Sequence, residues 1–403
     1  MRISTQTFYE QSRTTMGAQQ SSLLRVQQQL GAGTKILAPS DDPLGATRAL
    51  AVSQSISLTA QYSASRNQAV QTLSLEENAL QSVTTLLQKV KSSLIEAGNG
   101  TMTDADRATI ATTLQSDLDQ LQGLANTDDG NGQFLFAGFR SSSAPFVGLA
   151  GGGIGYIGDQ GQRQVQVDVS RQMAGTDDGR SIFLSVQSGA GYVASAPTAN
   201  TGSGVFSATS VVDPTDVNYG KDFVISFPVA GSYQVDTVSL PKTTLVAATP
   251  FTPGSAIKFG GLQISISGTP AAGDVINVAT AKYAGSDVFA AIGDVIQALR
   301  TPMNGPKNQA LVLNALSTAN RKLTNAHDNV LTVRSSVGSR LQELDALAVV
   351  ADNRTLFDKS HLSDLQDLDY SSAIAEFYQR QTALQASQQT FVKIQQISLF
   401  NYL

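Results

Sequence analysis

The apolar positions of this chain follow helical periods toward both ends and alternate with polar positions in the middle. No proline or glycine occurs between Ala46 and Ala97, so about 50 residues are predicted to form one helix roughly 80 Å long. Its second half repeats leucine every seven residues, and a later stretch repeats apolar residues at the same interval. The two stretches predict an antiparallel, coiled-coil-like rod of α-helices. The repeats are Leu73, Leu80, Leu87 and Leu94, and then Leu316, Leu323, Val330, Val337 and Leu344.

The first rod helix carries a local start signal. Acidic N-cap residues followed by proline at the first helical position favour helix initiation, because proline lacks an N–H that would stay unpaired there anyway. Thr103 and Asp106 form a second such signal, a capping box, and predict another helix that continues to about Leu124. The start signature of the rod helix consists of Ser40, Asp41, Asp42 and Pro43.

Each end of the chain is predicted to form an amphipathic helix with a narrow apolar stripe. Isolated helices of this kind are marginally stable in water, so we expect the two stripes to pair with each other and with neighbouring subunits. A buried Leu or Phe contributes roughly 1.5 to 3 kcal/mol, so contacts with neighbouring subunits could supply the free energy that orders the two terminal helices. The predicted assembly stripes are Tyr9, Met16, Leu23 and Leu30 near the start, and Ile374, Phe377, Leu384, Phe391 and Ile394 near the end.

Strand patterns replace helical ones in the middle of the chain. Val165, Val167 and Val169 alternate with polar residues, which predicts a hairpin strand, and similar short runs follow up to residue 284. The fold class is therefore α+β: a helical rod with an inserted antiparallel β domain. We divide the chain into terminal helices at 1–30 plus 361–403, a rod with β-hairpins at 31–184 plus 285–360, and the inserted β domain at 185–284.

Composition removes several functional classes. Charged residues make up 15% of the 403 residues and the net charge is −5, so the basic footprint of a nucleic-acid-binding protein is missing. The chain has no cysteine, which excludes disulfides and thiolate chemistry. No stretch of about 18 apolar residues predicts a membrane span, and the opening residues lack the apolar core of a secretory leader. We expect neither nucleic acid nor membrane as a partner.

Candidate chemistry is sparse. Gly153 to Gly158 matches a dinucleotide-binding pattern, but an alternating strand follows where a helix is required, so a glycine turn is predicted instead. The only histidines are His327, interpreted as a tolerated polar position on the rod, and His361, whose following aspartates we interpret as helix-start charge. The pairs Asp128–Asp129 and Asp177–Asp178 lack EF-hand spacing and predict turns. We predict no catalytic residue, cofactor or metal, and hence no enzyme.

Three segments carry a family resemblance. Lys35 to Ala46, which contains the start signature, is similar to the N-terminal signature of flagellins and their hook-associated relatives. Phe134 to Gly138 resembles the family element where helix passes to hairpin. The extreme termini, Met1 to Thr5 and Ser398 to Leu403, are most similar to the hook-associated branch. The resemblance covers roughly residues 1–185 and 285–403, and the β insertion matches none of these motifs.

The resemblance implies a secreted subunit of the bacterial flagellum at the hook–filament junction. Its terminal helices would form an inner tube (D0), the long helices the rod (D1), and the β domain an outward part (D2). Implied partners are hook-associated protein 1, flagellin, copies of the chain itself in a ring, and a flagellar export chaperone, with type III export. One alternative is a flagellin that forms the filament. Another is a glycan-binding adhesin whose inserted domain exposes Tyr219, Tyr233 and Phe251 for stacking on sugars.

Overall fold

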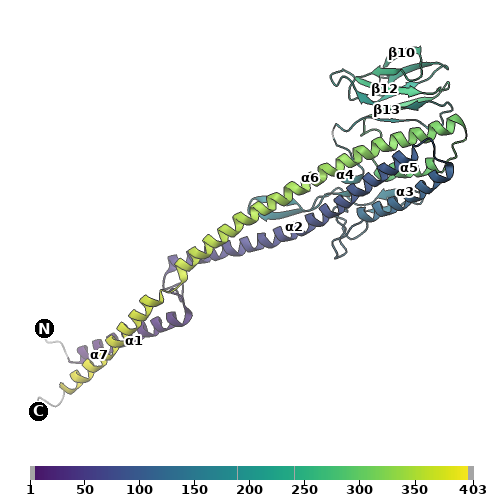
Figure 1. Cartoon of the computed structure of the whole chain (residues 1–403). Helices are drawn as coiled ribbons and strands as arrows, with labels where there is room; N and C mark the ends of the chain where they lie inside the picture. Colours follow the sequence, from purple (N-terminus) through teal and green to yellow (C-terminus); the bar gives the residue numbers. More distant parts are fainter. Residues whose placement is uncertain (1–4, 188, 240, 398–403) are drawn as a thin grey trace. The chain divides into compact units, whose positions relative to one another are not determined.

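The computed structural model describes residues 5–187, 189–239 and 241–397 (Figure 1). The chain divides into two compact units, one formed by residues up to 64 together with those from 346, the other by residues 65–345. The fold class is α+β, as predicted, with long helices and antiparallel sheets. The three-part domain division expected from the sequence stays a prediction.

Two long helices form the rod, and both contribute to each unit. Helix α2 spans Pro43–Ala97, the bounds that the proline start and the glycine end predict, and helix α6 spans Gly305–Gln366. Within the larger unit they are joined by an ion pair in which Arg334 Nη2 lies 2.5 Å from Glu77 Oε1. The repeated apolar positions line the buried face of each helix, confirming the coiled-coil-like pattern. Those at most 3% exposed are Leu73, Leu80, Val83, Leu87, Val90 and Leu94, together with Leu323, Val330, Val337 and Leu344.

Helix α6 continues further than the aspartates after His361 suggested. The interpretation of those aspartates as helix-start charge is wrong for Asp364, which lies in the last turns of α6. It is right for Asp369, whose Oδ1 accepts the backbone N–H of Ser371 at 3.0 Å at the start of the next helix. The reason is that no proline or glycine follows Gly338 to stop α6 before residue 367.

Shorter helices complete the helical layer of the larger unit. Helix α3 (Asp104–Ala125) begins with the predicted capping box, in which Thr103 and Asp106 bond reciprocally to each other's backbone N–H. It packs against α5 (Val288–Leu299). Beside them a cluster of four phenylalanines closes the core, with ring centroids 5.0 to 5.8 Å apart. The cluster consists of Phe136, Phe146, Phe183 and Phe289.

Two hairpins and a short helix follow the helical layer. Strands β1 (Phe146–Gly148) and β2 (Ile154–Tyr156) pair across a turn in which Gly152 and Gly153 adopt positive φ. The glycine turn predicted for Gly153 to Gly158 is therefore confirmed at Gly153 only, because the residues that follow form β2. Strand β3 (Gln164–Asp168) pairs with β4 (Arg171–Ala174), and α4 spans Gly179–Phe183. The alternation predicted through Val169 ends one residue early. Val169 lies beyond β3 in the turn and is 59% exposed.

The inserted β domain is built from two sheets around an apolar core. One sheet has the strand order β10-β9-β8-β13-β5, and the other has the order β11-β12-β6 with β7 also paired to β12. Phe223, Ile225 and Ile264 are among the fully buried residues between them. The strands are β5 (Val193–Ser195), β6 (Val205–Phe206), β7 (Ser210–Val211), β8 (Phe223–Ser226), β9 (Ser232–Thr237), β10 (Thr244–Pro250), β11 (Ala256–Phe259), β12 (Leu262–Ser267) and β13 (Val275–Ala279).

Polar side chains on one face of α6 hold the insertion against the rod. Asn314 accepts the N–H of Phe206 at 3.1 Å and donates to the carbonyl of Gly204 at 2.8 Å. Asn325 donates to Gly191 O at 2.9 Å. The spacing of three or four residues places the whole set on one helical face. The α6 residues that bond to the backbone of residues 181–206 are Asn314, Thr318, Arg321, Asn325 and Asn329.

Candidate assembly surface

The two terminal helices pair with each other inside one chain. Helix α1 spans Thr5–Ala32, and helix α7 spans Tyr370–Ile397 beside it (Figure 1). Toward the free ends the ring of Tyr9 meets the ring of Phe391 edge to face, with centroids 5.2 Å apart. Such an aromatic contact contributes about 0.5 to 1.5 kcal/mol beyond the area that it buries.

The segments that connect these helices to the rod are joined by backbone hydrogen bonds. The N–H of Lys35 donates to Gln366 O at 2.8 Å, and the N–H of Leu368 donates to Gly33 O at 3.0 Å. Gly33 has φ of 70°, and a Cβ there would lie 2.9 Å from the hydroxyl oxygen of Tyr370. Glycine is therefore required both by its backbone conformation and by the close approach of α7.

The start signature works as the sequence predicts and also anchors α1. Asp42 Oδ1 accepts the N–H of Gly45 at 2.9 Å, which caps the first turn of α2. Asp41 accepts the N–H groups of Leu37 and Ala38, and its other oxygen lies 3.1 Å from Arg25 Nη2 on α1. Ser40 and Pro43 are exposed. The signature is thus a structural joint between helices.

Most side chains of the predicted assembly stripes are half buried within the chain itself. Ile374 is the exception, being 44% exposed, and the side chain of Ile394 lies outside the described residues. The terminal segments Met1 to Ser4 and Ser398 to Leu403, which carried part of the resemblance, also lie outside them. The role of the stripes in assembly stays a prediction. The half-buried members are Tyr9, Met16, Leu23, Leu30, Phe377, Leu384 and Phe391.

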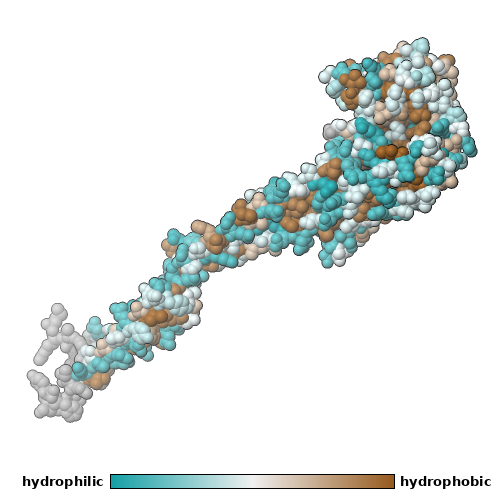
Figure 2. Space-filling view, viewed as in Figure 1, coloured by the Kyte–Doolittle hydropathy of each residue, from teal (hydrophilic) through white to brown (hydrophobic). Residues whose placement is uncertain are grey.

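A larger set of apolar side chains is exposed on this unit, and apart from Ile374 the sequence reasoning missed it. Leu356 and Phe357 on α6 are each 70% exposed, and Val349 and Val350, one heptad earlier, are 62% and 63% exposed. Figure 2 shows apolar surface interspersed with polar surface around α1 and α7. The adjacent pairs Val349–Val350 and Leu356–Phe357, seven residues apart, were the sequence signal from which this exposed set could have been predicted. The other members are Leu24, Leu37, Leu44, Leu50, Leu58, Tyr370, Ile374, Tyr378 and Val392.

We call these thirteen side chains the exposed apolar set. Apolar side chains that gather on one surface usually mark contacts with other molecules, and Val349, Val350, Leu356 and Phe357 share one face of α6. Because all members except Leu37 lie on helices that already have one partner, a second layer of helices is the geometry that would cover them.

Little in the described residues suggests chemistry. Within residues 5–397, gaps aside, no group of three or more His, Asp or Glu side chains is arranged to hold a metal ion. None of the described helices has both the length and the apolar character to cross a membrane. His327 lies 3.4 Å from Gln88 in a side-chain contact between α6 and α2, consistent with a tolerated rod position. Asp129 accepts the N–H groups of Asn131 and Gln133, confirming a turn.

Of the aromatic residues proposed for sugar stacking, Tyr233 and Phe251 lie together, with ring centroids 6.4 Å apart, but both are partly buried. Phe251 packs edge to face on buried Phe227, with centroids 5.5 Å apart, and Tyr233 packs against the same core. Tyr219 alone of the three is exposed, at 38%. The arrangement therefore offers one aromatic side chain rather than a stacking platform.

Comparisons with known proteins agree with this architecture. Residues 3–141 match the bacterial flagellin N-terminal helical region, and residues 320–403 match the bacterial flagellin C-terminal helical region. The paired terminal helices and the rod thus define a flagellin-type protein. More narrowly, the chain belongs to the flagellar hook-associated protein 3 family. It is 32% identical over 403 residues to that protein of Salmonella typhimurium and 31% identical over 401 residues to that of Escherichia coli, covering 99% of each chain.

Solved structures show the same fold. FlgL of Xanthomonas campestris matches with a TM-score of 0.67 and 28% identity, over 79% of this chain and 99% of that one. Hook-associated protein 3 of Legionella pneumophila matches with a TM-score of 0.70 and 26% identity, over 78% of this chain and 98% of that one. These relatives are structural flagellar proteins, and the family's place is the bacterial flagellum.

Proposed function

We propose that this chain is a structural subunit that joins the hook to the flagellin filament as one of a ring of identical copies. On one side it would contact hook-associated protein 1 and on the other flagellin. Its mechanism is packing of helices, with no catalytic residue, cofactor or metal. The proposal is supported by the full-length similarity to hook-associated protein 3 and by the exposed apolar set on the terminal unit.

The exposed apolar set is the observation that carries the proposal. In a monomer its side chains remain in water, whereas each buried large side chain contributes roughly 1.5 to 3 kcal/mol. Assembly with neighbouring helices would supply that free energy. We further propose that the chain is secreted through the flagellar type III apparatus, with an export chaperone bound to the C-terminal helix until assembly.

A substitution on the exposed set tests the proposal. Phe357→Asp introduces a charge where we place a buried contact, and Asn320→Asp introduces the same charge at an exposed polar position of the same helix that belongs to the larger unit. In cells that lack the natural protein, we expect Phe357→Asp to release flagellin into the medium and leave hooks without filaments. Asn320→Asp should restore filaments.

Two controls keep the outcome interpretable. The amount of each variant in the medium reports export, and circular dichroism of the purified monomer reports folding. An exported, folded Phe357→Asp variant that still supports attached filaments would contradict the proposed surface. Purified protein that polymerises alone into long filaments would favour a flagellin instead, and glycan binding by residues 185–284 would favour an adhesin.

A further inference from the structure

An exposed phenylalanine on the larger unit lies in a loop whose backbone is held by hydrogen bonds to one carboxylate. Phe139 is 65% exposed. Its N–H donates to Asp159 Oδ1 at 2.8 Å, and the N–H of Gly161 donates to the same oxygen at 2.8 Å. These donors hold the pKa of Asp159 below its ordinary value. The loop therefore presents Phe139 outward from a fixed frame.

Two glycines allow this presentation. Gly138 has φ of 68°, and a Cβ there would lie 2.2 Å from Asp159 Oδ1. Gly161 has no room for a side chain because the ring of Phe139 covers it, 2.1 Å from the position of a Cβ. The backbone path at Gly138 and the packing of the Phe139 ring on Gly161 therefore both require glycine, which has no side chain. A rigid aromatic anchor loses little conformational entropy on binding, which is typical of interface hot spots.

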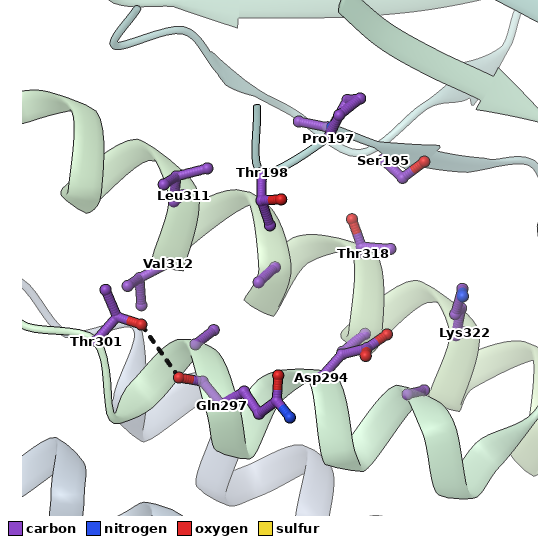
Figure 3. A pocket seen from close by; sticks show the side chains of 15 residues that line it. Ser195, Pro197, Thr198, Asp294, Gln297, Thr301, Leu311, Val312, Thr318 and Lys322 are labelled. Atoms are coloured by element: carbon purple, nitrogen blue, oxygen red, sulfur yellow. Dashed lines mark hydrogen bonds between the residues drawn. The ribbon is translucent and has the colours of Figure 1, made fainter. Parts of the chain in front are cut away.

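The same unit contains a cavity suited to such an anchor. It has a volume of about 450 Å³ and lies between α5, α6 and residues 195–198 (Figure 3). Its floor is apolar, with Leu311 and Val312 from α6 and alanines from both helices. Asp294 lies on the α5 wall and Lys322 on the α6 wall. The cavity therefore has an apolar floor, with a carboxylate on its α5 wall and an ammonium group on its α6 wall.

We propose that Phe139 of one copy inserts into the cavity between α5 and α6 of a second copy of this chain, with Arg140 pairing with Asp294. The exposed guanidinium of Arg140 follows Phe139 directly, and the carboxylate of Asp294 is exposed on the α5 wall, so these two charges are complementary, while the ammonium group of Lys322 lies on the α6 wall. Loop and cavity share no residue, so the contact is head-to-tail. Contacts of this type close rings when the rotation permits.

This inference rests on the ring of copies in the proposed function, and a cysteine experiment separates the two. The chain has no cysteine, so introduced pairs are the only thiols. Ser142→Cys and Gln297→Cys place exposed thiols beside the anchor and at the cavity wall, and they leave Phe139, Arg140 and Asp294 unchanged. After mild oxidation of isolated hook–filament complexes, we expect disulfide-linked dimers of this chain. Ser142→Cys with Thr109→Cys, an exposed position on α3, is the matched control and should give none.

Variants at the contact complete the test. Phe139→Ser in the paired-cysteine chain should lower the dimer yield about tenfold, as loss of an anchor residue does. Arg140→Glu and Asp294→Arg should each lower it, and the two changes together should restore it. Unlinked protein in the complexes, a yield that Phe139→Ser leaves unchanged, or linkage of Ser142→Cys to another protein would overturn the inference and leave the proposed function standing. Absence of the unmodified chain from the complexes would overturn both.

Discussion

The terminal unit and the larger unit use similar helices in different ways. In the larger unit the repeated leucines of α2 and α6 are almost completely buried, and α3, α5 and the β domain add further core. In the terminal unit the stripe residues are only half buried, and thirteen large apolar side chains are exposed. A heptad pattern therefore predicts that a helix has a partner, but the extent of its burial depends on how many layers surround the pair.

The largest effect is expected from a core deletion in the larger unit. Leu323 is 0% exposed on α6, and Leu323→Ala removes buried methyl groups and leaves a cavity. We expect a loss of about 2 to 5 kcal/mol in the free energy of unfolding of that unit. Urea unfolding followed by circular dichroism measures it. Leu331→Ala, at a position on the same helix that is 40% exposed, should change stability by less than about 0.5 kcal/mol. Equal effects would mean that the two positions do not differ in burial.

A smaller effect is expected at a buried acidic cluster of the same unit. Glu76 on α2 is 0% exposed, and its Oε1 accepts the N–H of Asp177 at 3.2 Å while its Oε2 has no partner. Asp177 itself forms an ion pair with Arg340 of α6 and accepts a bond from Gln162. Burial first, and then the nearby carboxylate of Asp177, raise the pKa of Glu76 well above its ordinary value, although Arg340 opposes the shift.

The sign of the pH dependence follows from that raised pKa. Between the ordinary pKa of a glutamate and the raised one, the folded chain holds a proton that the unfolded chain has released, so this site lowers stability as pH rises. Glu76→Gln removes the ionisation, and we expect it to flatten this fall and to stabilise the chain at neutral pH. Unfolding measured at several pH values tests it, with Glu96→Gln, exposed on the same helix, as control. A Glu76→Gln variant with the unchanged pH slope would contradict the assignment.

Local signals in the sequence predicted much of the helical part. The bounds of α2 follow from Pro43 and Gly98, and the start of α3 from its capping box, because each signal acts within a few residues. Such local signals do not predict contacts between residues that are distant in the sequence. The bonds from Asn314 and Asn325 to the backbone of the insertion join residues 108 to 134 positions apart, and no periodicity in the sequence encodes them.

The candidate surface was predicted less well for the same reason. The pairing of the stripes at Tyr9 and Phe391 was predicted, but the apolar side chains that this pairing leaves exposed were not. Leu356 and Phe357 fit an apolar helical pattern just as Leu323 does, yet they are 70% exposed. Periodicity identifies a face of a helix, whereas exposure depends on the elements that the rest of the chain places over that face.

The smallest effect is expected where the terminal helices meet, because that contact has no second layer. Tyr9→Ala removes the edge-to-face contact with Phe391, and we expect a cost of about 1 kcal/mol or less. Hydrogen exchange of the purified monomer should show faster exchange in α1 and α7 and unchanged exchange from residue 65 to residue 345, since Tyr9 belongs to the terminal unit. Gln11→Ala, exposed on the same helix, should leave both regions unchanged.

In the unaltered monomer, limited proteolysis should likewise remove roughly 30 to 40 residues at each end before it cuts the larger unit. If α1 and α7 instead exchanged as slowly as the leucine-lined part of α2, the terminal pair would be stable without neighbours. Assembly would then have no ordering free energy to supply to it.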